Sequence, residues 1–263
     1  MSSTRLSAII ITHNEAGTIE RCLRSLSFAD EKIVVDAKST DATRSIAQRL
    51  GGQVLTRPWS GFGDQKNVGR DKASGDWLLF IDADEEVTPA LADAMQKKVS
   101  STTVDFLWLR IVTVFLGKPL WHLYGHNPRL FKKSAGKWTS DAVHEQVETL
   151  SGQRLRLNDR LSAVISEPLL HHSHETIQSY VNQMHRYTTL DAQQMAKANT
   201  HRSSRPVRPT IWLPYQLSCR QFVKMFLYKR GFLDGYAGFI WCVLSAYYEY
   251  EMAVKYRKLT VRA

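Results

Sequence analysis

The first hundred residues alternate short apolar runs with amphipathic segments, and this alternation constrains the fold more than any other feature of the chain. Four runs have the composition and length of buried strands: residues 6–12, 32–36, 54–55 and 77–81. The segment around Cys22 and the segment from Asp41 to Leu50 have the apolar spacing of helices. Because strands that alternate with helices build a mostly parallel sheet covered on both faces, the sequence predicts an α/β fold.

Polar residues follow three of the predicted strands. They form clusters at residues 12–15, 36–41 and 82–86. The carboxyl ends of parallel strands meet at one edge of a sheet, and the functional loops of such sheets gather there. We therefore expect one site to which all three clusters contribute.

Beyond residue 100 the pattern changes. Residues 104–147 are short β-rich pieces broken by Gly and Pro, which is typical of hairpins. Residues 173–198 have helical periodicity, residues 202–209 have the composition of a linker, and residues 210–258 contain two aromatic-rich helical stretches. The sequence therefore predicts two domains. The first, over residues 1–200, carries the site and has one part over about residues 6–100 and another over about residues 101–200. The second is a basic aromatic helical tail over residues 201–263.

The charge of the chain is concentrated at one end. From residue 201 onward, eleven Lys and Arg stand against three Asp and Glu, so +8 of the formal net charge of +10 lies in the tail. A local basic excess favours an anionic partner, either nucleic acid or acidic lipid. The three cysteines are far apart and suggest neither a disulfide framework nor a zinc site, and the apolar run at residues 6–11 is too short for a signal peptide. These features favour a reducing cytoplasm.

Two carboxylates, Asp82 and Asp84, follow the predicted strand 77–81 and are separated by one residue. Residues at this spacing on extended backbone project to the same side, so the pair has the arrangement that holds a hard cation. Mg²⁺ or Mn²⁺ bound through one or two carboxylates and phosphate oxygens is the usual arrangement in nucleotide chemistry. The alternative is a solvated acidic loop before the helix predicted to begin near Pro89.

A series of motifs surrounds this pair: Ile10-Ile11-Thr12-His13-Asn14-Glu15, Val35-Asp36, Ser39-Thr40-Asp41, Gln65-Lys66-Asn67, Gly75-Asp76-Trp77 and Phe80-Ile81-Asp82-Ala83-Asp84-Glu85. In order and spacing the series resembles family 2 of the glycosyltransferases, which have the nucleotide-binding GT-A fold, over about residues 6–100. Further motifs match downstream: Arg129-Leu130-Phe131, Val143-His144-Glu145 and Leu169-Leu170-His171. With these, roughly residues 6–200 resemble the lipopolysaccharide inner-core β-1,4-glucosyltransferases.

The resemblance implies a set of donor-binding residues: Thr12, Asn14, Glu15 and Asp36 at the uridine, Asp41 in the pocket wall, Lys66 and Asn67 near the donor, and Asp82 at the ribose or sugar. It places the metal on Asp84, with His171 as a further metal ligand or diphosphate contact. For Asp36 the alternative is a turn acceptor, and for Lys66 and Asn67 it is a surface helix. Although His172 and His174 lie beside His171, no second ligand cluster supports zinc, and we do not predict it.

The expected reaction needs a base that removes the proton of the acceptor hydroxyl as its oxygen attacks the anomeric carbon. We expect Glu145 to be this base, with Asp141 as the second candidate. His144 could be the base, an acceptor contact or an orienting group, and the alternative for it is a structural hydrogen bond. The resemblance implies inversion at the anomeric carbon, whereas a retaining route would need a nucleophile on the opposite face of the sugar.

The sequence departs from the family pattern after Asp36. Ala37-Lys38 stands where Ser-Gly is common, so the turn must be built differently or Lys38 must adopt positive φ. His13 replaces the more usual Lys or Tyr. Both changes bear on the identity of the donor.

The basic tail mixes aromatic and cationic side chains, for example Trp212, Tyr215, Lys229 and Arg230. This composition is typical of an interfacial helix pair on an anionic membrane surface, and the alternative is packing on the catalytic domain or in a dimer. The overall hypothesis is a peripheral enzyme at the cytoplasmic face of the inner membrane, transferring glucose from UDP-glucose to a heptose of a lipid-linked core saccharide. Alternatives are a polyprenyl phosphate or capsule acceptor or, in a different class, a nucleic-acid-binding module that uses the tail.

Overall fold

The computed structural model describes residues 4–140, 145–157, 159–174, 176–201, 203 and 205–260. The chain forms two compact units. The first extends to Val112 and resumes from Gly125 to His172, and the second holds residues Thr113–Tyr124 and everything from Ser173 onward. The domain boundary predicted at residue 200 stays a prediction, although helix α5 (Ile177–Ala198) belongs to the second unit by its contacts.

Within the described residues, nine strands form one mixed sheet in the order β3-β2-β1-β4-β8-β6-β11-β5, with β7 paired to β6. The strands are β1 (Leu6–Thr12), β2 (Glu31–Asp36), β3 (Gln53–Thr56), β4 (Trp77–Asp82), β5 (Glu85–Val87), β6 (Phe106–Phe115), β7 (Lys118–Pro119), β8 (Gly125–Lys132) and β11 (Ser162–His174). The first four in this order pair in parallel, and β8 joins β4 antiparallel. The predicted α/β fold is confirmed, including the four N-terminal strands and the hairpins beyond residue 100, where β9 (Gly136–Trp138) pairs with β10 (Val147–Thr149).

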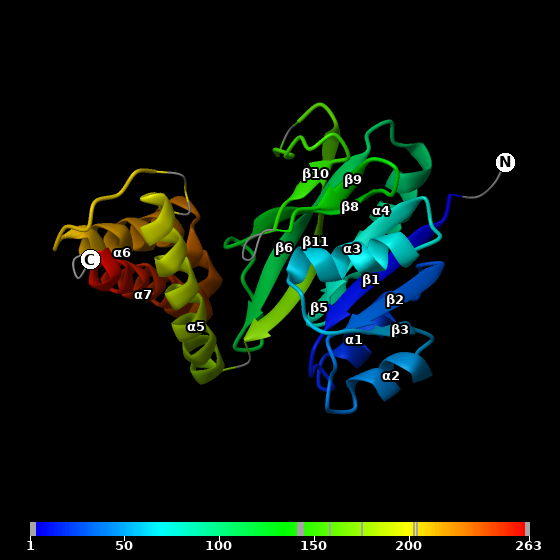
Figure 1. The fold of residues 1–263 in the computed structure, drawn as a ribbon, viewed down its shortest axis with the longest axis horizontal. Helices are drawn as coiled ribbons and strands as arrows, with labels where there is room; N and C mark the ends of the chain where they lie inside the picture. Colours follow the sequence, from blue (N-terminus) through cyan, green and yellow to red (C-terminus); the bar gives the residue numbers. More distant parts are fainter. Residues whose placement is uncertain are drawn as a thin grey trace. The chain divides into compact units, whose positions relative to one another are not determined.

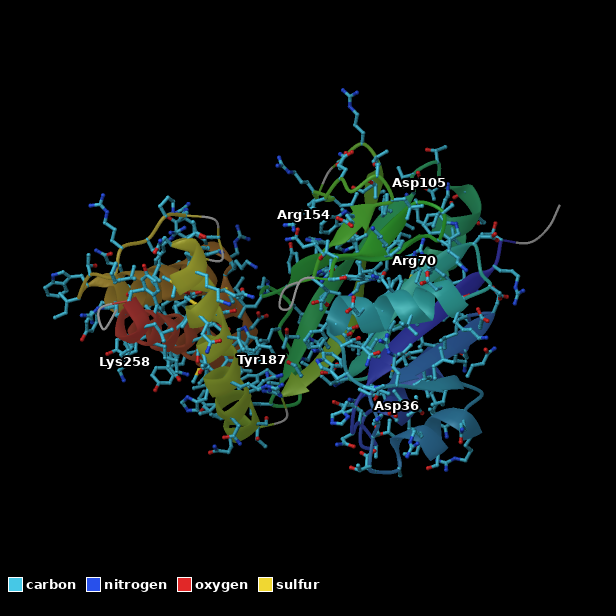
Figure 2. The ribbon with its side chains drawn as sticks, viewed as in Figure 1. Asp36, Arg70, Asp105, Arg154, Tyr187 and Lys258 are labelled. Atoms are coloured by element: carbon cyan, nitrogen blue, oxygen red, sulfur yellow. The ribbon has the colours of Figure 1, made fainter. Side chains whose placement is uncertain are left out.

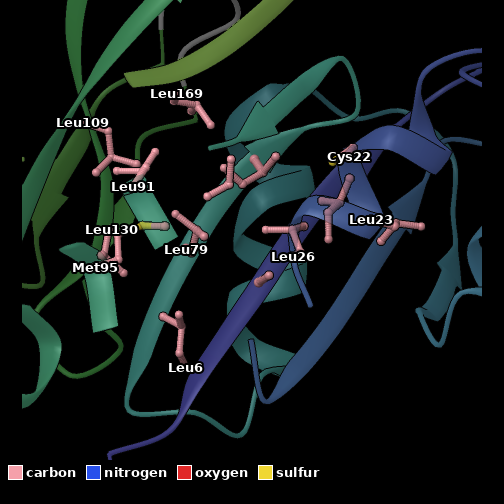
Figure 3. Packing of buried hydrophobic residues seen from close by; sticks show 14 of the residues in the cluster. Leu6, Cys22, Leu23, Leu26, Leu79, Leu91, Met95, Leu109, Leu130 and Leu169 are labelled. Carbon is pink, nitrogen blue, oxygen red and sulfur yellow. The ribbon is translucent and has the colours of Figure 1, made fainter. Parts of the chain in front are cut away.

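Side chains alternate between the two faces of the sheet, and each face has its own core. Ala8 and Ile10 of β1 point into a cluster with α1 (Ile19–Ser25), α2 (Thr43–Arg49) and α4 (Pro89–Ser101). Ile9 and Ile11 point the other way, toward α3 (Phe62–Lys72) and the β9–β10 hairpin. Figure 1 shows the helices against the strands, and Figure 3 shows the packing of the first cluster. Period-2 burial on both faces is what a covered parallel sheet requires.

The register of the parallel strands brings their carboxyl ends into line. Thr12 at the end of β1 lies opposite Asp36 at the end of β2. On the other side of β1, Ile11 lies opposite Asp82 at the end of β4. The polar clusters that follow these strands therefore start from the same edge of the sheet, as the sequence predicts.

The second unit is largely helical. It contains α5, α6 (Leu213–Val223), a π-helical turn (Lys224–Tyr228), a 3₁₀ turn (Gly231–Asp234) and α7 (Gly235–Thr260). The two predicted aromatic-rich helical stretches are thus confirmed, whereas the helix predicted over residues 173–198 begins only at Ile177, because Ser173 and His174 still belong to β11. In the described part of the chain, no helix combines the length and apolarity needed to cross a bilayer.

Gly69 is where α3 approaches the sheet most closely. A Cβ at this position would lie 2.3 Å from Ile9 Cγ2, and Ile9 is fully buried. We expect Gly69→Ala to lower the free energy of unfolding by about 2 kcal/mol, since overpacking costs about 3 kcal/mol and the better helix propensity of Ala returns about 1. Denaturant unfolding measures this loss.

Gly17→Ala is the matched control, because a Cβ at Gly17 has no neighbour within 4 Å. Gly17→Ala should leave the denaturant concentration at the unfolding midpoint unchanged or raise it slightly. Equal midpoints for the two variants would contradict the close packing of α3 on β1.

Candidate active site

Asp36 closes the end of β2 and is fully buried (Figure 2). Its carboxylate accepts hydrogen bonds from the Ser39 backbone N–H (3.0 Å) and from the Ser39 hydroxyl, and Arg44 Nε lies 3.9 Å away. In this structure Asp36 therefore acts as the turn acceptor that the sequence offered as its alternative role. Its donor-binding role stays a prediction.

The loops after β1 and β2 are joined through Asn14. Its backbone N–H donates to Ser39 Oγ (2.9 Å), and its side-chain Oδ1 accepts the N–H of Thr40 (2.8 Å). Asn14 and Lys38 both have positive φ, 56° and 59°. The sequence allowed either a differently built turn at Ala37-Lys38 or a positive φ at Lys38. The chain has the positive φ, so Lys38 lies in the left-handed region that Gly normally occupies.

Glu15 and Asp41 form the wall behind this junction. Glu15 donates its N–H to Thr43 Oγ1 (2.8 Å) and accepts the Thr18 hydroxyl at 2.6 Å, and burial raises the pKa of its carboxyl. Asp41 is exposed and accepts the N–H groups of Thr43 (3.0 Å) and Ala16 (3.1 Å). The hydrogen bonds from Thr43 lower the pKa of Asp41. Both carboxylates hold the loops in place.

Asp82 lies between two cations at the end of β4. Arg129 Nη2 of strand β8 donates to Asp82 Oδ2 at 2.6 Å, and Lys66 Nζ lies 3.7 Å from Asp82 Oδ1. Burial opposes ionisation, but Arg129 and Lys66 hold the pKa of Asp82 well below its ordinary value. Asp82 is therefore a fixed anion.

Glu85 lies beneath Asp82 and is nearly fully buried. Its Oε1 accepts from Arg129 Nη2 (2.9 Å), and its Oε2 accepts the backbone N–H of Asp82 (2.8 Å). Burial and the neighbouring Asp82 charge raise the pKa of Glu85 to about 7, although Arg129 acts in the opposite direction. The guanidinium of Arg129 thus bridges two carboxyl groups, one with a lowered pKa and one with a raised pKa.

Lys66 connects Asp82 to the predicted base. Its buried ammonium lies 2.7 Å from Glu145 Oε1 and 4.3 Å from the ring centre of Trp138. Asn67, the next residue of α3, exchanges two hydrogen bonds with the Trp138 backbone, 2.8 Å and 3.0 Å long. Lys66 therefore reaches the charged cluster, whereas the hydrogen bonds of Asn67 fasten the β9–β10 hairpin to α3. The donor-binding roles predicted for both residues stay predictions.

Glu145 is placed by the contacts between Thr139 and Gln146 that close the loop between β9 and β10. Thr139 N–H donates to the Gln146 carbonyl (2.8 Å), and Gln146 N–H donates to Thr139 Oγ1 (3.0 Å). Thr139 also lies close to α3 where Gly63 leaves room, since a Cβ at Gly63 would lie 1.9 Å from the Thr139 carbonyl oxygen. The other two predicted catalytic residues, Asp141 and His144, lie outside the described residues.

Asp84 and His171 face each other, and the metal-binding roles predicted for both stay predictions. His171 Nε2 lies 3.1 Å from Asp84 Oδ2, and strand pairing places His171 opposite Glu85. Burial lowers the pKa of the imidazole, but the hydrogen bond to Asp84 and the nearby carboxylates outweigh it and raise the pKa of His171 to about 9. Ligation of a metal would therefore release a proton from His171 at neutral pH.

The spacing of these two groups fits a hard cation. Adjacent ligands of an octahedral ion with bonds of about 2.1 Å lie about 3.0 Å apart. Among the described residues, no group of three or more His, Cys, Asp and Glu is arranged to hold a metal by itself. A cation at Asp84 and His171 would need further ligands from a bound molecule.

Several polar atoms at this edge of the sheet are buried without a hydrogen-bond partner among the described residues. They are Thr12 Oγ1, Asp82 Oδ1, and Nε and Nη1 of Arg129. Buried polar groups are rarely left unpaired, because each lost hydrogen bond costs about 1–3 kcal/mol. Their accumulation at the ends of β1 and β4 indicates a site that a polar ligand completes.

Sequence reasoning gave no role to Arg129 or to the Glu85 side chain. Both residues stood within recognised motifs, and a signal for Arg129 was present: an arginine directly before the apolar pair Leu130-Phe131 in a β-rich segment can be buried only with a counter-ion. Which carboxylate it meets could not be inferred locally. Asp82 is 47 positions away along the chain.

A family match and similar proteins from two organisms agree on the family of this chain. Residues 7–162 match the family described as Glycosyl transferase family 2. An uncharacterized glycosyltransferase of Rickettsia bellii (strain RML369-C) is 29% identical over 269 residues, which cover 98% of this chain and 88% of the relative. The lipopolysaccharide core biosynthesis glycosyltransferase LpsC of Rhizobium meliloti (strain 1021) is 24% identical over 274 residues, covering 98% and 94%.

Solved structures show the same fold. The mannosyltransferase PcManGT from Pyrobaculum calidifontis, in complex with GDP-Man and Mn²⁺, has a TM-score of 0.54 at 18% identity and covers 96% of this chain and 86% of its own. S. aureus TarS 1-349 in complex with UDP-GlcNAc has a TM-score of 0.50 at 17% identity, with 98% and 91% covered. At such identities the likeness concerns the fold.

The Arg129 bridge generates a stability prediction. Arg129→Met leaves Asp82 and Glu85 without their shared cation, so we expect it to lower the free energy of unfolding by about 3–5 kcal/mol. The double variant Arg129→Met/Glu85→Gln should recover part of this loss because one buried carboxylate is gone. Denaturant unfolding at constant pH measures both.

Arg24→Met is the control, since Arg24 forms an exposed pair with Glu20 on α1. It should cost less than about 1 kcal/mol. A loss of similar size for Arg24→Met and Arg129→Met would show that the buried bridge is not a special support of the site.

Proposed function

This chain belongs to glycosyl transferase family 2 and is a glycosyltransferase with a GT-A fold, and we propose that it transfers glucose from UDP-glucose to a heptose of the lipopolysaccharide inner core. The observation that carries the proposal is the set of buried, unpartnered polar atoms at the ends of β1 and β4, next to the Asp84–His171 pair. A sugar nucleotide offers hydroxyl and phosphate groups that match these atoms. The relative LpsC, named for core biosynthesis, supports the class of acceptor.

The donor would enter at the carboxyl ends of the parallel strands. Thr12 Oγ1 and Asp82 Oδ1 are buried there without a hydrogen-bond partner that the described residues supply, and Asp82 as a fixed anion suits ribose or sugar hydroxyls. The binding of UDP-GlcNAc by TarS, which shares the fold, supports a UDP-sugar. The loop that Asn14 ties to Ser39 and Thr40 would form the wall at the base.

We place a divalent metal, Mg²⁺ or Mn²⁺, on Asp84 and His171. Their spacing fits adjacent positions of an octahedral ion, and the diphosphate oxygens of the donor would supply further ligands. When bound, such an ion neutralises charge on the departing diphosphate. The Mn²⁺ in the PcManGT complex supports a metal in this fold.

Glu145 is the proposed base. Its carboxylate is held beside Lys66, which in turn neighbours Asp82, so base and donor anchor belong to one ion-pair chain. In a single displacement, Glu145 would accept the proton of the acceptor hydroxyl while that oxygen forms the new bond and the diphosphate leaves, with inversion at the anomeric carbon. The acceptor would be a lipid-linked saccharide at the cytoplasmic face of the inner membrane, and a polyprenyl phosphate or capsule acceptor is the alternative that an acceptor screen would reveal.

Asp84→Asn tests the metal assignment. Calorimetric titration of UDP in the presence of Mn²⁺ should show at least tenfold weaker binding than the unaltered chain, because one ligand loses its charge. Titration of UDP alone should change little. The exposed Asp93 of α4 gives the control Asp93→Asn, which should bind normally. Undiminished Mn²⁺-dependent binding by Asp84→Asn would refute the assignment.

Glu145→Gln tests the base. The amide keeps the size of the side chain and a hydrogen bond to Lys66 but cannot take the proton, so we expect kcat to fall by about 10²–10⁴-fold. The dissociation constant for UDP with Mn²⁺ should stay within about threefold, because binding does not use the base. Asp141→Asn, measured in parallel, distinguishes the two candidates: a large loss of kcat there and a small one in Glu145→Gln would move the role to Asp141.

A further inference from the structure

Helices α6 and α7 run side by side within the second unit (Figure 1). Both leave apolar side chains exposed. On α6 and its π-helical extension, the exposed side chains recur every three or four residues: Trp212, Tyr215, Cys219, Val223 and Leu227. On α7 they recur in the same way: Tyr236, Phe239, Val243 and Tyr247. Each helix therefore presents one apolar stripe to the outside.

Ring contacts join the two stripes into one face. At one end Tyr215 of α6 packs on Tyr250 of α7 (5.5 Å between ring centres), and Tyr250 stacks on Tyr247. At the other end Phe226 packs on Phe239 at 6.0 Å and on Phe232 at 5.8 Å. We call this surface, made of the two stripes and these rings, the hairpin face.

The aromatic side chains of the hairpin face are unusually exposed to solvent. Trp212 is 67% exposed, Tyr236 is 70% exposed, and Tyr228 at the turn is 82% exposed. Soluble domains rarely display a contiguous apolar surface of this kind unless it meets a partner. The face spans about 24 Å along α6 and its extension, since sixteen residues rise about 1.5 Å each.

Around the hairpin face, the acidic side chains are turned inward and basic side chains are exposed. The three acidic residues of the tail turn inward: Asp234 is 2% exposed and accepts from the His122 backbone, Glu249 pairs with His201, and Glu251 pairs with Lys255. By contrast Arg220, Lys224 and Arg230 are exposed, and the described residues give them no carboxylate partner. The border of the face is therefore positive.

From this sorting we propose that the hairpin face lies flat in the headgroup region of an anionic lipid bilayer. Tyr, Trp and Phe are the side chains that settle at this depth, and exposed cations at the border would meet lipid phosphates. A second copy of the chain fits less well, because a twofold contact would bring the same positive border against itself. The inference does not depend on which sugar is transferred.

Cosedimentation of the full chain with vesicles tests the proposal. We expect binding to vesicles of phosphatidylglycerol and phosphatidylcholine, weaker binding to pure phosphatidylcholine, and a decline with added salt. The apolar variant Trp212→Ser/Leu227→Ser/Tyr236→Ser should bind anionic vesicles at least tenfold more weakly. The charge variant Arg220→Gln/Lys224→Gln/Arg230→Gln should lose the preference for anionic over neutral lipid.

Matched controls come from exposed residues of the first unit. Leu150→Ser/Leu157→Ser removes apolar surface, and Lys72→Gln/Lys97→Gln/Lys98→Gln removes three positive charges. Both should bind vesicles like the unaltered chain. Circular dichroism and UDP titration with Mn²⁺ verify that each variant is folded, and they separate a failure of this proposal from a failure of the proposed function.

Two outcomes would overturn the inference. One is unchanged vesicle binding by both the apolar and the charge variants. The other is a chain that ignores vesicles but sediments as a dimer, with the apolar variant monomeric, because the hairpin face would then be a contact between copies.

Discussion

Arg129 carries the electrostatic balance of the first unit. The Asp82 side chain at the end of a buried strand is 29% exposed and that of Glu85 is 1% exposed, so two carboxylates lie close together where access to water is limited. Such a pair is tolerable only with a cation between them. The guanidinium of Arg129 supplies it from the neighbouring antiparallel strand, so the addition of β8 to the parallel half of the sheet also provides the counter-ion for the carboxylates at this edge.

The same cluster connects the parts that a transfer reaction needs to keep together. Lys66 extends the chain of charges from Asp82 to Glu145, and Asp84, two residues after Asp82, pairs with His171. Each group is fixed by a neighbour of opposite charge, so little reorganisation is needed when substrates bind. Thr12 Oγ1 and Asp82 Oδ1, at the ends of β1 and β4, are buried without a hydrogen-bond partner among the described residues, and a ligand there would satisfy them.

Pairing of opposite charges also determines which side chains of the second unit face inward. The three acids of the tail over residues 201–263 turn inward, in contacts with His122, His201 and Lys255. This leaves exposed apolar side chains on α6 and α7, with the exposed cations Arg220, Lys224 and Arg230 close to them in the chain. Asp234 illustrates the point: by sequence it interrupts an apolar run, and in the fold it fastens the turn to the loop after β7.

The sequence by itself determined the local pattern of this protein: the strands β1, β2 and β4, the polar clusters at their carboxyl ends, and the helical tail. Apolar period and turn residues act over short distances, so they are legible without the fold. Only the tertiary structure decided that Arg129 meets Asp82, that Lys66 meets Glu145 79 residues away, and that Asp84 meets His171 87 residues away. It also decided that Asp36 turns to Ser39 and that the acids of the tail face inward. These choices depend on strand order and helix packing, which bring together side chains that no local pattern relates.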